Sequence, residues 1–317
     1  MLRCPLGQRD SARMRPYGLR PPKPCANDSG GLVSAPGSVM AAVLTYLGMA
    51  DSAVRKANPS PGEVTVASYV DAGGVHTWYD EHGTGRPLVL LHGGFSDASE
   101  FGANIPALAE RFRVLTPERR GHGHTPDIAG PISYDLMAAD TAVFLDTLGI
   151  AQAHLVGHSD GANVALLIAL TRPDLADRLV LISGNFHYDG LVTGLDLDEL
   201  AANPYLADAY AAVSPDGRDH FPVVAAKIAR MVSAEPALGT GDLARVAART
   251  LVMAGDDDAV SAEHTLALYR GIPDSELAII PGTSHALIVE KPGLCNQIIL
   301  DFLTTDPVPT FMPVRRA

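Results

Sequence analysis

The spacing of apolar residues changes twice near the start of the folded part of this chain. Apolar and polar residues alternate over Val64–Val70 and over Val75–Tyr79, and Gly73-Gly74 stands between the two runs. This pattern is typical of an antiparallel hairpin. Pro87–Leu91 is instead continuously apolar, as expected of a strand that is covered on both faces.

Beyond this run, short apolar stretches alternate with stretches of helical spacing. Helices are predicted over 99–111, 134–148, 161–171, 262–270 and 290–303, and strands over 113–116, 154–157, 179–183, 250–254 and 277–281. Between 185 and about 245 the strands stop, and alanine-rich helical stretches at 200–213 and 222–232 replace them. The order predicts an α/β fold, with a mostly parallel, doubly wound sheet and an inserted helical lid.

The two ends of the chain lack these periods. Residues 1–61 are rich in Pro, Gly, Ser and, in their first half, Arg, which predicts a disordered or mis-annotated extension that is dispensable for folding and catalysis. Its apolar run Val39–Ala50 is too short to span a bilayer, but it leaves open a signal sequence and export. The folded domain is expected over 62–304, followed by a tail over 305–317.

Composition narrows the possible partners and the compartment. The formal net charge of -12 and the pI near 5.3 argue against a nucleic-acid or anionic-membrane partner, either of which calls for a basic face. The three cysteines, Cys4, Cys25 and Cys295, have neither zinc-site nor disulfide-framework spacing. A reducing compartment, the cytoplasm, is the simplest expectation. No metal and no organic cofactor is expected.

The candidate chemistry centres on Gly157-His158-Ser159-Asp160-Gly161, between a predicted strand and a predicted helix. A G-x-S-x-G turn in that setting is a nucleophile elbow, which exposes the serine hydroxyl at the end of a sheet. Two further polar loops follow strands that are predicted to end at the same edge. One carries three adjacent carboxylates, Asp256 to Asp258, and the other carries His285. A serine, a carboxylate and a histidine are the groups that nucleophilic hydrolysis requires.

At these positions the chain resembles the α/β-hydrolase superfamily from about Val64 to Leu303. The matching segments are His92-Gly93-Gly94, Arg120-Gly121-His122-Gly123, the elbow, Gly255–Asp258 and Gly282–His285. The resemblance implies a triad of Ser159, Asp258 and His285, with an oxyanion held by the backbone amides of Asp160 and of Gly94, or of Phe95 next to it. The sequence departs from the family in having Glu118 before the Arg-Gly-His-Gly segment and Asp160 after the nucleophile.

Four side chains near these motifs have competing interpretations. Asp160 is predicted to stabilise the start of a helix through its charge, and the alternative is a contact with the substrate. His122, His124 and His158 are predicted to satisfy backbone groups in turns rather than to act as second bases. Candidate pocket residues in the lid are Phe186, His187, Tyr210 and Phe221.

The resulting hypothesis is a hydrolase that cleaves a small ester or lactone through an acyl-serine intermediate. Alternatives with the same triad are a C–C bond hydrolase and a cofactor-free perhydrolase, and a ligand-binding receptor on a hydrolase fold is an alternative of another class. The lid has many apolar residues and more acidic than basic ones, which favours a neutral acyl group. The sequence makes no prediction about oligomeric state.

Overall fold

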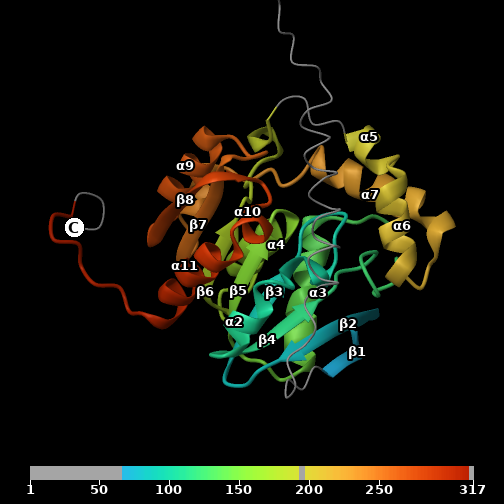
Figure 1. The fold of residues 1–317 in the computed structure, drawn as a ribbon, viewed down its shortest axis with the longest axis horizontal. Coiled ribbons are helices and arrows are strands. Elements are labelled where there is room, and N and C mark those ends of the chain that lie inside the picture. The colour runs from blue at the N-terminus through green and yellow to red at the C-terminus, as the bar shows by residue number, and fades with distance from the viewer. Residues whose placement is uncertain (1–65, 193–196, 314–317) are drawn as a thin grey trace, which may run out of the picture. The chain divides into compact units, whose positions relative to one another are not determined.

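A computed structural model describes residues 66–192 and 197–313 (Figure 1). The extension predicted over 1–61 lies outside the described residues. Within the described part, the strands form one sheet in the order β1-β2-β4-β3-β5-β6-β7-β8. The strands are β1 (Val66–Ala72), β2 (Val75–His82), β3 (Arg86–Leu91), β4 (Phe112–Pro117), β5 (Ala153–His158), β6 (Ala176–Ile182), β7 (Arg249–Asp257) and β8 (Ser275–Ser284).

Only β2 runs against the direction of the other strands. β1 pairs antiparallel with β2, and β2 pairs antiparallel with β4, whereas the remaining neighbours are parallel. The predicted hairpin around Gly73-Gly74 is therefore confirmed, with β1 ending two residues later and β2 ending three residues later than the alternating runs. Both glycines have positive φ, 61° and 89°, a conformation that other residues adopt with strain.

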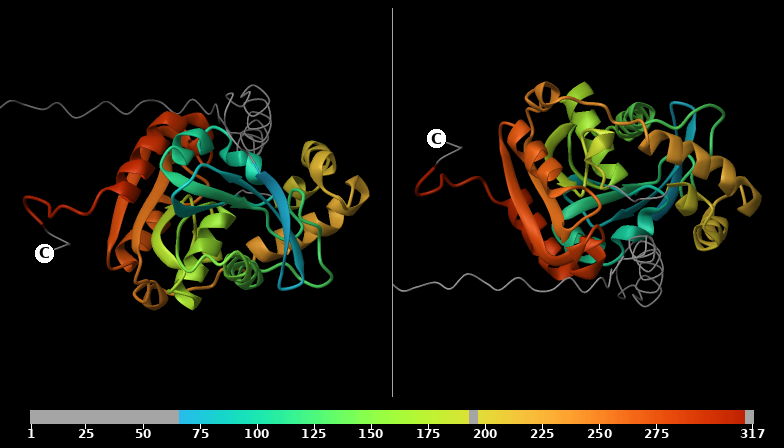
Figure 2. Two further views of the ribbon diagram at one scale, coloured as in Figure 1. Left: turned by 90° about the horizontal axis from the view of Figure 1, so that it is seen from below. Right: turned by 90° about the horizontal axis from the view of Figure 1, so that it is seen from above.

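Helices cover both faces of the sheet, as Figure 2 shows from two sides. On one face the side chains of α3 (Tyr134–Thr147), α4 (Asp160–Thr171) and α9 (Ala262–Gly271) pack with the sheet into one apolar cluster. On the other face α2 (Ile105–Ala109), α10 (Leu287–Glu290) and α11 (Pro292–Thr304) form a second cluster. β5 is buried at every position, which explains why its sequence lacks polar alternation. The α/β prediction is confirmed.

Two predicted helices are each broken in two near a proline. The segment predicted as a helix over 99–111 forms a 3₁₀ turn, η1 (Ala98–Phe101), and then α2, which has Pro106 in its first turn. Proline has no N–H and clashes with the preceding turn, so it is tolerated best at the start of a helix. The prediction of a single helix was wrong over 99–111. The helix predicted over 290–303 is confirmed as α11, which begins two residues later at Pro292.

The lid is the helical segment between β6 and β7, and it breaks in the same way. The helix predicted over 200–213 is split into α5 (Leu197–Ala201) and α6 (Pro204–Val213), and Asn203 caps the second piece by accepting the amides of Tyr205 and Leu206. α7 (Phe221–Val232) and α8 (Thr240–Leu243) complete the lid, and α7 contacts both α5 and α6 (Figure 1).

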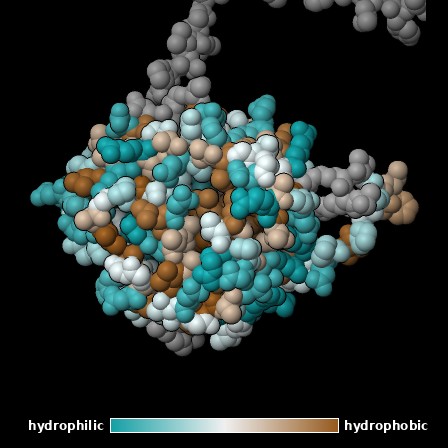
Figure 3. Space-filling model, turned by 180° about the vertical axis from the view of Figure 1, so that it is seen from behind, coloured by the Kyte–Doolittle hydropathy of each residue, from teal (hydrophilic) through white to brown (hydrophobic). Residues whose placement is uncertain are grey.

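The surface of the described residues is mixed in polarity. In Figure 3 hydrophobic and hydrophilic residues are interspersed over the face turned away from the view of Figure 1. Within 66–192 and 197–313, no helix combines the length and the apolar character needed to cross a lipid bilayer.

Candidate active site

The elbow at Ser159 joins the end of β5 to the start of α4. Ser159 has φ 53° and ψ -121°, a left-handed conformation that is costly for a residue with a side chain. A Cβ at Gly157 would lie 2.2 Å from the carbonyl oxygen of Gly161, and a Cβ at Gly161 would lie 1.9 Å from that of Leu91. Strand, turn and helix therefore approach one another so closely that only glycine fits at both positions.

The structure brings Ser159, His285 and Asp258 into one hydrogen-bonded chain. His285 Nε2 lies 2.9 Å from Ser159 Oγ, and His285 Nδ1 lies 2.7 Å from Asp258 Oδ1. Because a carboxylate can only accept, Nδ1 carries the proton and Nε2 is free to accept the serine proton. The three residues follow β5, β8 and β7, which end at the same edge of the sheet.

Of the three adjacent aspartates, only Asp258 contacts the histidine. Its side chain is 2% exposed, and Ser183 Oγ and the amides of Gly255 and Val260 all donate to it. Burial opposes ionisation, but the His285 ring and these donors outweigh burial and hold the pKa of Asp258 well below its usual range. Asp256 is exposed and instead accepts the Thr283 amide at 3.0 Å.

Sequence reasoning missed Ser183, which follows the end of β6 next to the elbow strand. Its φ is 51°, so Ser159 and Ser183, which follow neighbouring strands, both have a positive φ. One of these serines faces His285 and the other donates to Asp258. The only sequence signal for Ser183 is its place directly after a buried strand, which many turn residues share.

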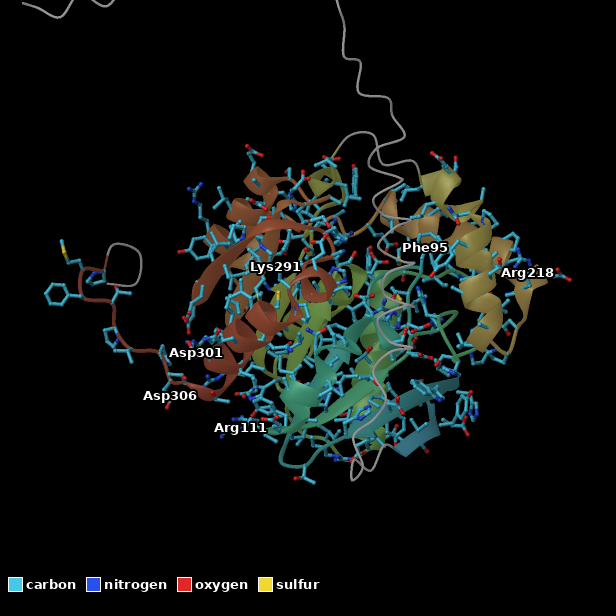
Figure 4. The ribbon with its side chains drawn as sticks, in the orientation of Figure 1. Phe95, Arg111, Arg218, Lys291, Asp301 and Asp306 are labelled. Carbon is cyan, nitrogen blue, oxygen red and sulfur yellow. The ribbon has the colours of Figure 1, made fainter. Side chains whose placement is uncertain are left out.

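The His92–Phe95 loop lies beside the elbow because β3 pairs with β5, with Leu91 opposite Gly157. A Cβ at Gly93 would lie 3.4 Å from Ser159 Cβ, and one at Gly94 would lie 2.3 Å from Asp160 Oδ2. Phe95 has φ 57°, and its ring packs against the apolar cluster that includes lid residues (Figure 4). The loop thus places the amides of Gly94 and Phe95 close to Asp160, although the role of these amides as oxyanion donors stays a prediction.

The side chain of Asp160 points into the protein rather than toward solvent. It is 6% exposed, and Tyr134 Oη donates to its Oδ1 at 2.7 Å. Burial raises the pKa of Asp160 despite that hydrogen bond and the nearby charge of Arg119. Its position in the first turn of α4 agrees with the helix-start interpretation, while the contact with Tyr134 was not foreseen.

Glu118 braces two loops. Its buried carboxyl accepts the amides of Ala98 and His124 and pairs with the His124 ring. Burial raises the pKa of Glu118, because it outweighs the hydrogen bonds from His124. This departure from the family pattern therefore has a structural role in the loop after β4.

The prediction that His122, His124 and His158 satisfy backbone groups in turns holds only for the first. His122 Nδ1 contacts the carbonyl oxygen of Arg120 at 3.0 Å, two residues before it. His124 instead pairs with the Glu118 side chain. His158 forms a buried pair with Glu100 and contacts the carbonyl oxygen of His285 at 2.8 Å. The histidine before Ser159 thus connects distant segments, which local sequence reasoning could not show.

The four predicted pocket residues fall into two groups near the lid. Phe186 stacks on His264, with ring centroids 4.0 Å apart, and His187 stacks on Tyr188. Tyr210 and Phe221 contact each other within the lid, with centroids 5.5 Å apart. The contacts of the described residues do not join any of the four to the triad, and their role in a pocket stays a prediction. The described residues also hold no group of three or more His, Cys, Asp or Glu side chains arranged to bind a metal ion.

Comparison with known proteins places this geometry in a family. The model of the alpha/beta hydrolase fold matches residues 86–222. A "Putative carbamate hydrolase RutD" from Stutzerimonas stutzeri is 30% identical over 255 residues, which cover 71% of this chain and 96% of that protein. A protein of the same name from Azorhizobium caulinodans is 28% identical over 258 residues, covering 74% and 97%.

Solved structures agree with the sequence matches. A serine hydrolase involved in carbazole degradation has a TM-score of 0.65 and 25% identity, covering 76% of this chain and 99% of that one. Est816, an N-acyl homoserine lactone degrading enzyme, has a TM-score of 0.60 and 25% identity, covering 74% and 100%. The chain therefore belongs to the α/β-hydrolase superfamily and is a hydrolase of that family.

Proposed function

We propose that this enzyme cleaves a small carboxylic ester or lactone through an acyl intermediate on Ser159. The observation that carries the proposal is the position of His285, whose two ring nitrogens contact Ser159 Oγ and Asp258 Oδ1 at 2.9 and 2.7 Å. A base on one side and an orienting carboxylate on the other are what an activated serine needs. Ester and lactone hydrolysis both follow from this arrangement.

In the first half of the reaction, Ser159 Oγ attacks the carbonyl carbon of the substrate while His285 Nε2 takes the hydroxyl proton. Asp258 stabilises the imidazolium that forms and keeps its Nδ1–H directed away from the substrate. His285 then gives the proton to the leaving alkoxide, and the C–O bond breaks to leave acyl-Ser159. In the second half, His285 activates a water that attacks the acyl carbon, and the acid is released.

Two backbone amides would stabilise the oxyanion in both halves. The Asp160 N–H stands in the first turn of α4, where amides have no partner within the helix and the dipole favours negative charge. The Gly94 N–H belongs to the loop that packs against Asp160. Donors of this kind are usually the largest single contribution to catalysis of acyl transfer.

The lid supports a neutral and moderately apolar acyl group. Its buried apolar side chains include Leu206, Tyr210, Phe221, Val224, Ile228 and Met231. Two of its cations are engaged in ion pairs, Lys227 with Asp127 and Arg218 with Asp208. They are therefore poorly placed to bind a substrate carboxylate or phosphate.

Hydrolysis of a carbamate is a second candidate. It is supported by the relatives whose printed name is carbamate hydrolase, one of them 30% identical over 255 residues. A carbamate also carries a carbonyl between a heteroatom and a leaving group, so the same triad and the same oxyanion donors would serve it. The matched comparison is a p-nitrophenyl carbamate beside p-nitrophenyl acetate.

The class of the enzyme is tested by an active-site probe. A fluorophosphonate should label the wild-type protein and not Ser159→Ala, and mass spectrometry should find the adduct on Ser159. Turnover of p-nitrophenyl acetate, a lactone and a 1,5-diketone distinguishes ester, lactone and C–C hydrolysis. An adduct on another serine, or stoichiometric binding without repeated turnover on any of these substrates, would exclude the proposal, and the latter would favour a receptor.

The preference for a neutral acyl group is tested with a chain-length series. From p-nitrophenyl acetate through butyrate to hexanoate, each added methylene should contribute up to about 0.8 kcal/mol to kcat/KM until the pocket is full. An acyl chain ending in carboxylate should react more slowly than its neutral isostere. Faster turnover of the anionic chain would contradict this preference.

A further inference from the structure

The His92–Phe95 loop is held by buried side chains that the reaction steps above do not use. Its peptide groups are planar and trans, so a carbonyl and the N–H of the next residue point in opposite directions. Any group that holds the Gly93 carbonyl in place therefore also sets the direction of the Gly94 N–H. The contacts of Gly93 thus bear directly on one of the two proposed oxyanion donors.

Arg119 binds the carbonyl side of this loop. Its Nη2 donates to the Gly93 carbonyl oxygen at 3.0 Å, and its Nη1 donates to the carbonyl oxygen of His92. His92 adds a second donor, because its Nδ1 lies 2.7 Å from the Gly93 oxygen, which can only accept. Burial, together with the charge of Arg119, lowers the pKa of His92 well below its usual value and keeps the ring neutral.

Glu100 binds the amide side. Its Oε2 accepts the Gly93 N–H at 2.9 Å, and its Oε1 pairs with His158 Nδ1. His158 Nε2 in turn donates to the carbonyl oxygen of His285 at 2.8 Å. The same buried pair therefore connects the His92–Phe95 loop, the residue before the nucleophile and the residue that contacts Ser159 Oγ.

The placement of charge indicates more than a structural brace. Arg119 is 4% exposed, and among the described residues no carboxylate lies close enough to form an ion pair with it. Burying a charged guanidinium costs free energy of desolvation, and here its two Nη groups donate to two backbone carbonyls. Arg120, the next residue, instead makes a bidentate pair with Asp140 at 2.6 and 2.7 Å.

We propose that Arg119 and Glu100 are positioning residues that hold the two peptide groups on either side of Gly93, so that the Gly94 N–H points at the carbonyl oxygen of a substrate on Ser159. Arg119 fixes the Gly93–Gly94 peptide through the Gly93 carbonyl, and Glu100 fixes the preceding peptide through the Gly93 N–H. This inference rests on the proposed acyl-serine chemistry. Neither side chain touches the substrate. Their effect is on the oxyanion, and it should therefore appear in the transition state and not in binding of the ground state.

The first test compares the two neighbouring arginines. Removing a whole oxyanion donor costs on the order of 10²- to 10³-fold in kcat, so misdirecting one by Arg119→Lys should lower kcat about 10- to 100-fold with little change in KM. The inhibition constant of an alkyl boronic acid, which forms a tetrahedral adduct on serine, should rise by a similar factor. Arg120→Lys, the matched control, should lower the melting temperature without changing kcat or that constant.

The second test approaches the same loop through Glu100, which binds the preceding peptide, in case Arg119→Lys does not fold. Glu100→Gln keeps an acceptor for the Gly93 N–H and a donor for His158, whereas Glu100→Ala keeps neither. The alanine variant should lose about 10- to 100-fold in kcat, and the glutamine variant should recover most of it. Glu118→Ala removes another buried glutamate paired with a histidine and should affect stability more than kcat.

The outcomes separate this inference from the proposed function. If the wild-type enzyme is not labelled at Ser159, the acyl-serine chemistry itself is wrong. If the wild type is labelled and active, three results would overturn the positioning roles. They are equal kcat losses in Arg119→Lys and Arg120→Lys, losses confined to KM, and an unchanged boronic acid constant in both Arg119→Lys and Glu100→Ala.

Discussion

The floor and the lid of the candidate site are held together by different forces. The floor consists of the loops after β3, β5, β7 and β8, and its buried polar groups are joined by hydrogen bonds such as those of Asp258 and Glu100. The lid, α5 to α8, packs mainly through apolar side chains of α6 and α7. Its polar attachment to the loop after β4 is Asp127, which accepts from Lys227 and His220.

This difference indicates how each region tolerates change. A buried polar network loses about 1–3 kcal/mol for each group left unpaired, so the floor has few acceptable substitutions. Apolar packing accepts volume-conserving replacements at less than about 1.5 kcal/mol each. We therefore expect changes in the floor to affect kcat and changes in the lid to affect KM and substrate preference.

The largest effect is expected at the nucleophile. Ser159→Ala should lower kcat by roughly 10⁵- to 10⁶-fold, because only binding and oxyanion effects remain to accelerate the reaction. The stability of the protein should change little. Ser183→Ala, which changes the serine with a positive φ at the next strand end, should cost only about 10-fold, since it removes one hydrogen bond to Asp258. Steady-state kinetics on p-nitrophenyl acetate measures both. Comparable losses of kcat in the two variants would mean that Ser183 has a direct role in the reaction.

The next largest loss of kcat is expected at Asp258, and it should distinguish Asp258 from its neighbour Asp256. Asp258→Asn should lower kcat by up to ~10⁴-fold, because an amide favours the wrong tautomer of His285. Asp256→Asn leaves the histidine untouched and should lower kcat less than about 5-fold, since it only weakens the bond from the Thr283 amide. A large loss of kcat in Asp256→Asn, together with an active Asp258→Asn variant, would contradict the assignment of Asp258 as the carboxylate that orients His285.

A substitution in the attachment of the lid should show the opposite kinetic pattern. The side chain of Asp127 is 6% exposed and lies 2.7 Å from Lys227 Nζ and 2.9 Å from His220 Nε2. Asp127→Asn should raise KM about 3- to 10-fold, equivalent to roughly 0.6–1.4 kcal/mol, and leave kcat within 2-fold. Asp146→Asn, which weakens an exposed pair with Arg172 far from the lid, is the control and should change neither. A fall in kcat alone would count against a division between floor and lid.

The last effect is a dependence of stability, and not of catalysis, on pH, and it originates at His122 in the loop after β4, next to His92 of the floor. Burial and the neighbouring Arg119 lower the pKa of His122 to about 3. An unfolded histidine takes up its proton near pH 6.5, whereas folded His122 stays neutral until the pH approaches 3. The stability associated with neutral His122 is therefore fully present above about pH 6.5 and is lost as the pH falls toward 3. Between pH 8 and pH 5 the loss from His122 should be about 2 kcal/mol, or roughly 4–8 °C in melting temperature.

The control for this dependence is a second histidine. The melting temperature of His122→Asn, measured by scanning calorimetry, should change less between pH 8 and pH 5 than that of the wild type. His76→Asn, which alters an exposed histidine beside Asp71, should behave like the wild type. An unchanged pH dependence in His122→Asn would show that His122 is protonated as easily in the folded protein as in the unfolded one.

The sequence by itself determined the features that depend on neighbours along the chain. The buried strands, the hairpin at Gly73-Gly74 and the elbow around Ser159 are confirmed, because hydrophobic spacing and glycine requirements act over a few residues. It failed near Pro106 and Pro204, where helical spacing continues but the helix does not. Proline was present in the sequence there, and giving it more weight would have placed the breaks.

Tertiary structure decided which polar groups meet. Glu100 and His158 are 58 positions apart, Arg119 and Gly93 are 26 apart, and Ser183 and Asp258 are 75 apart. No local period relates such pairs, since each forms only when the sheet order brings separate strand ends to one edge. The sequence could therefore suggest a nucleophile, a base and an acid, whereas the side chains that orient them became visible only in the folded chain.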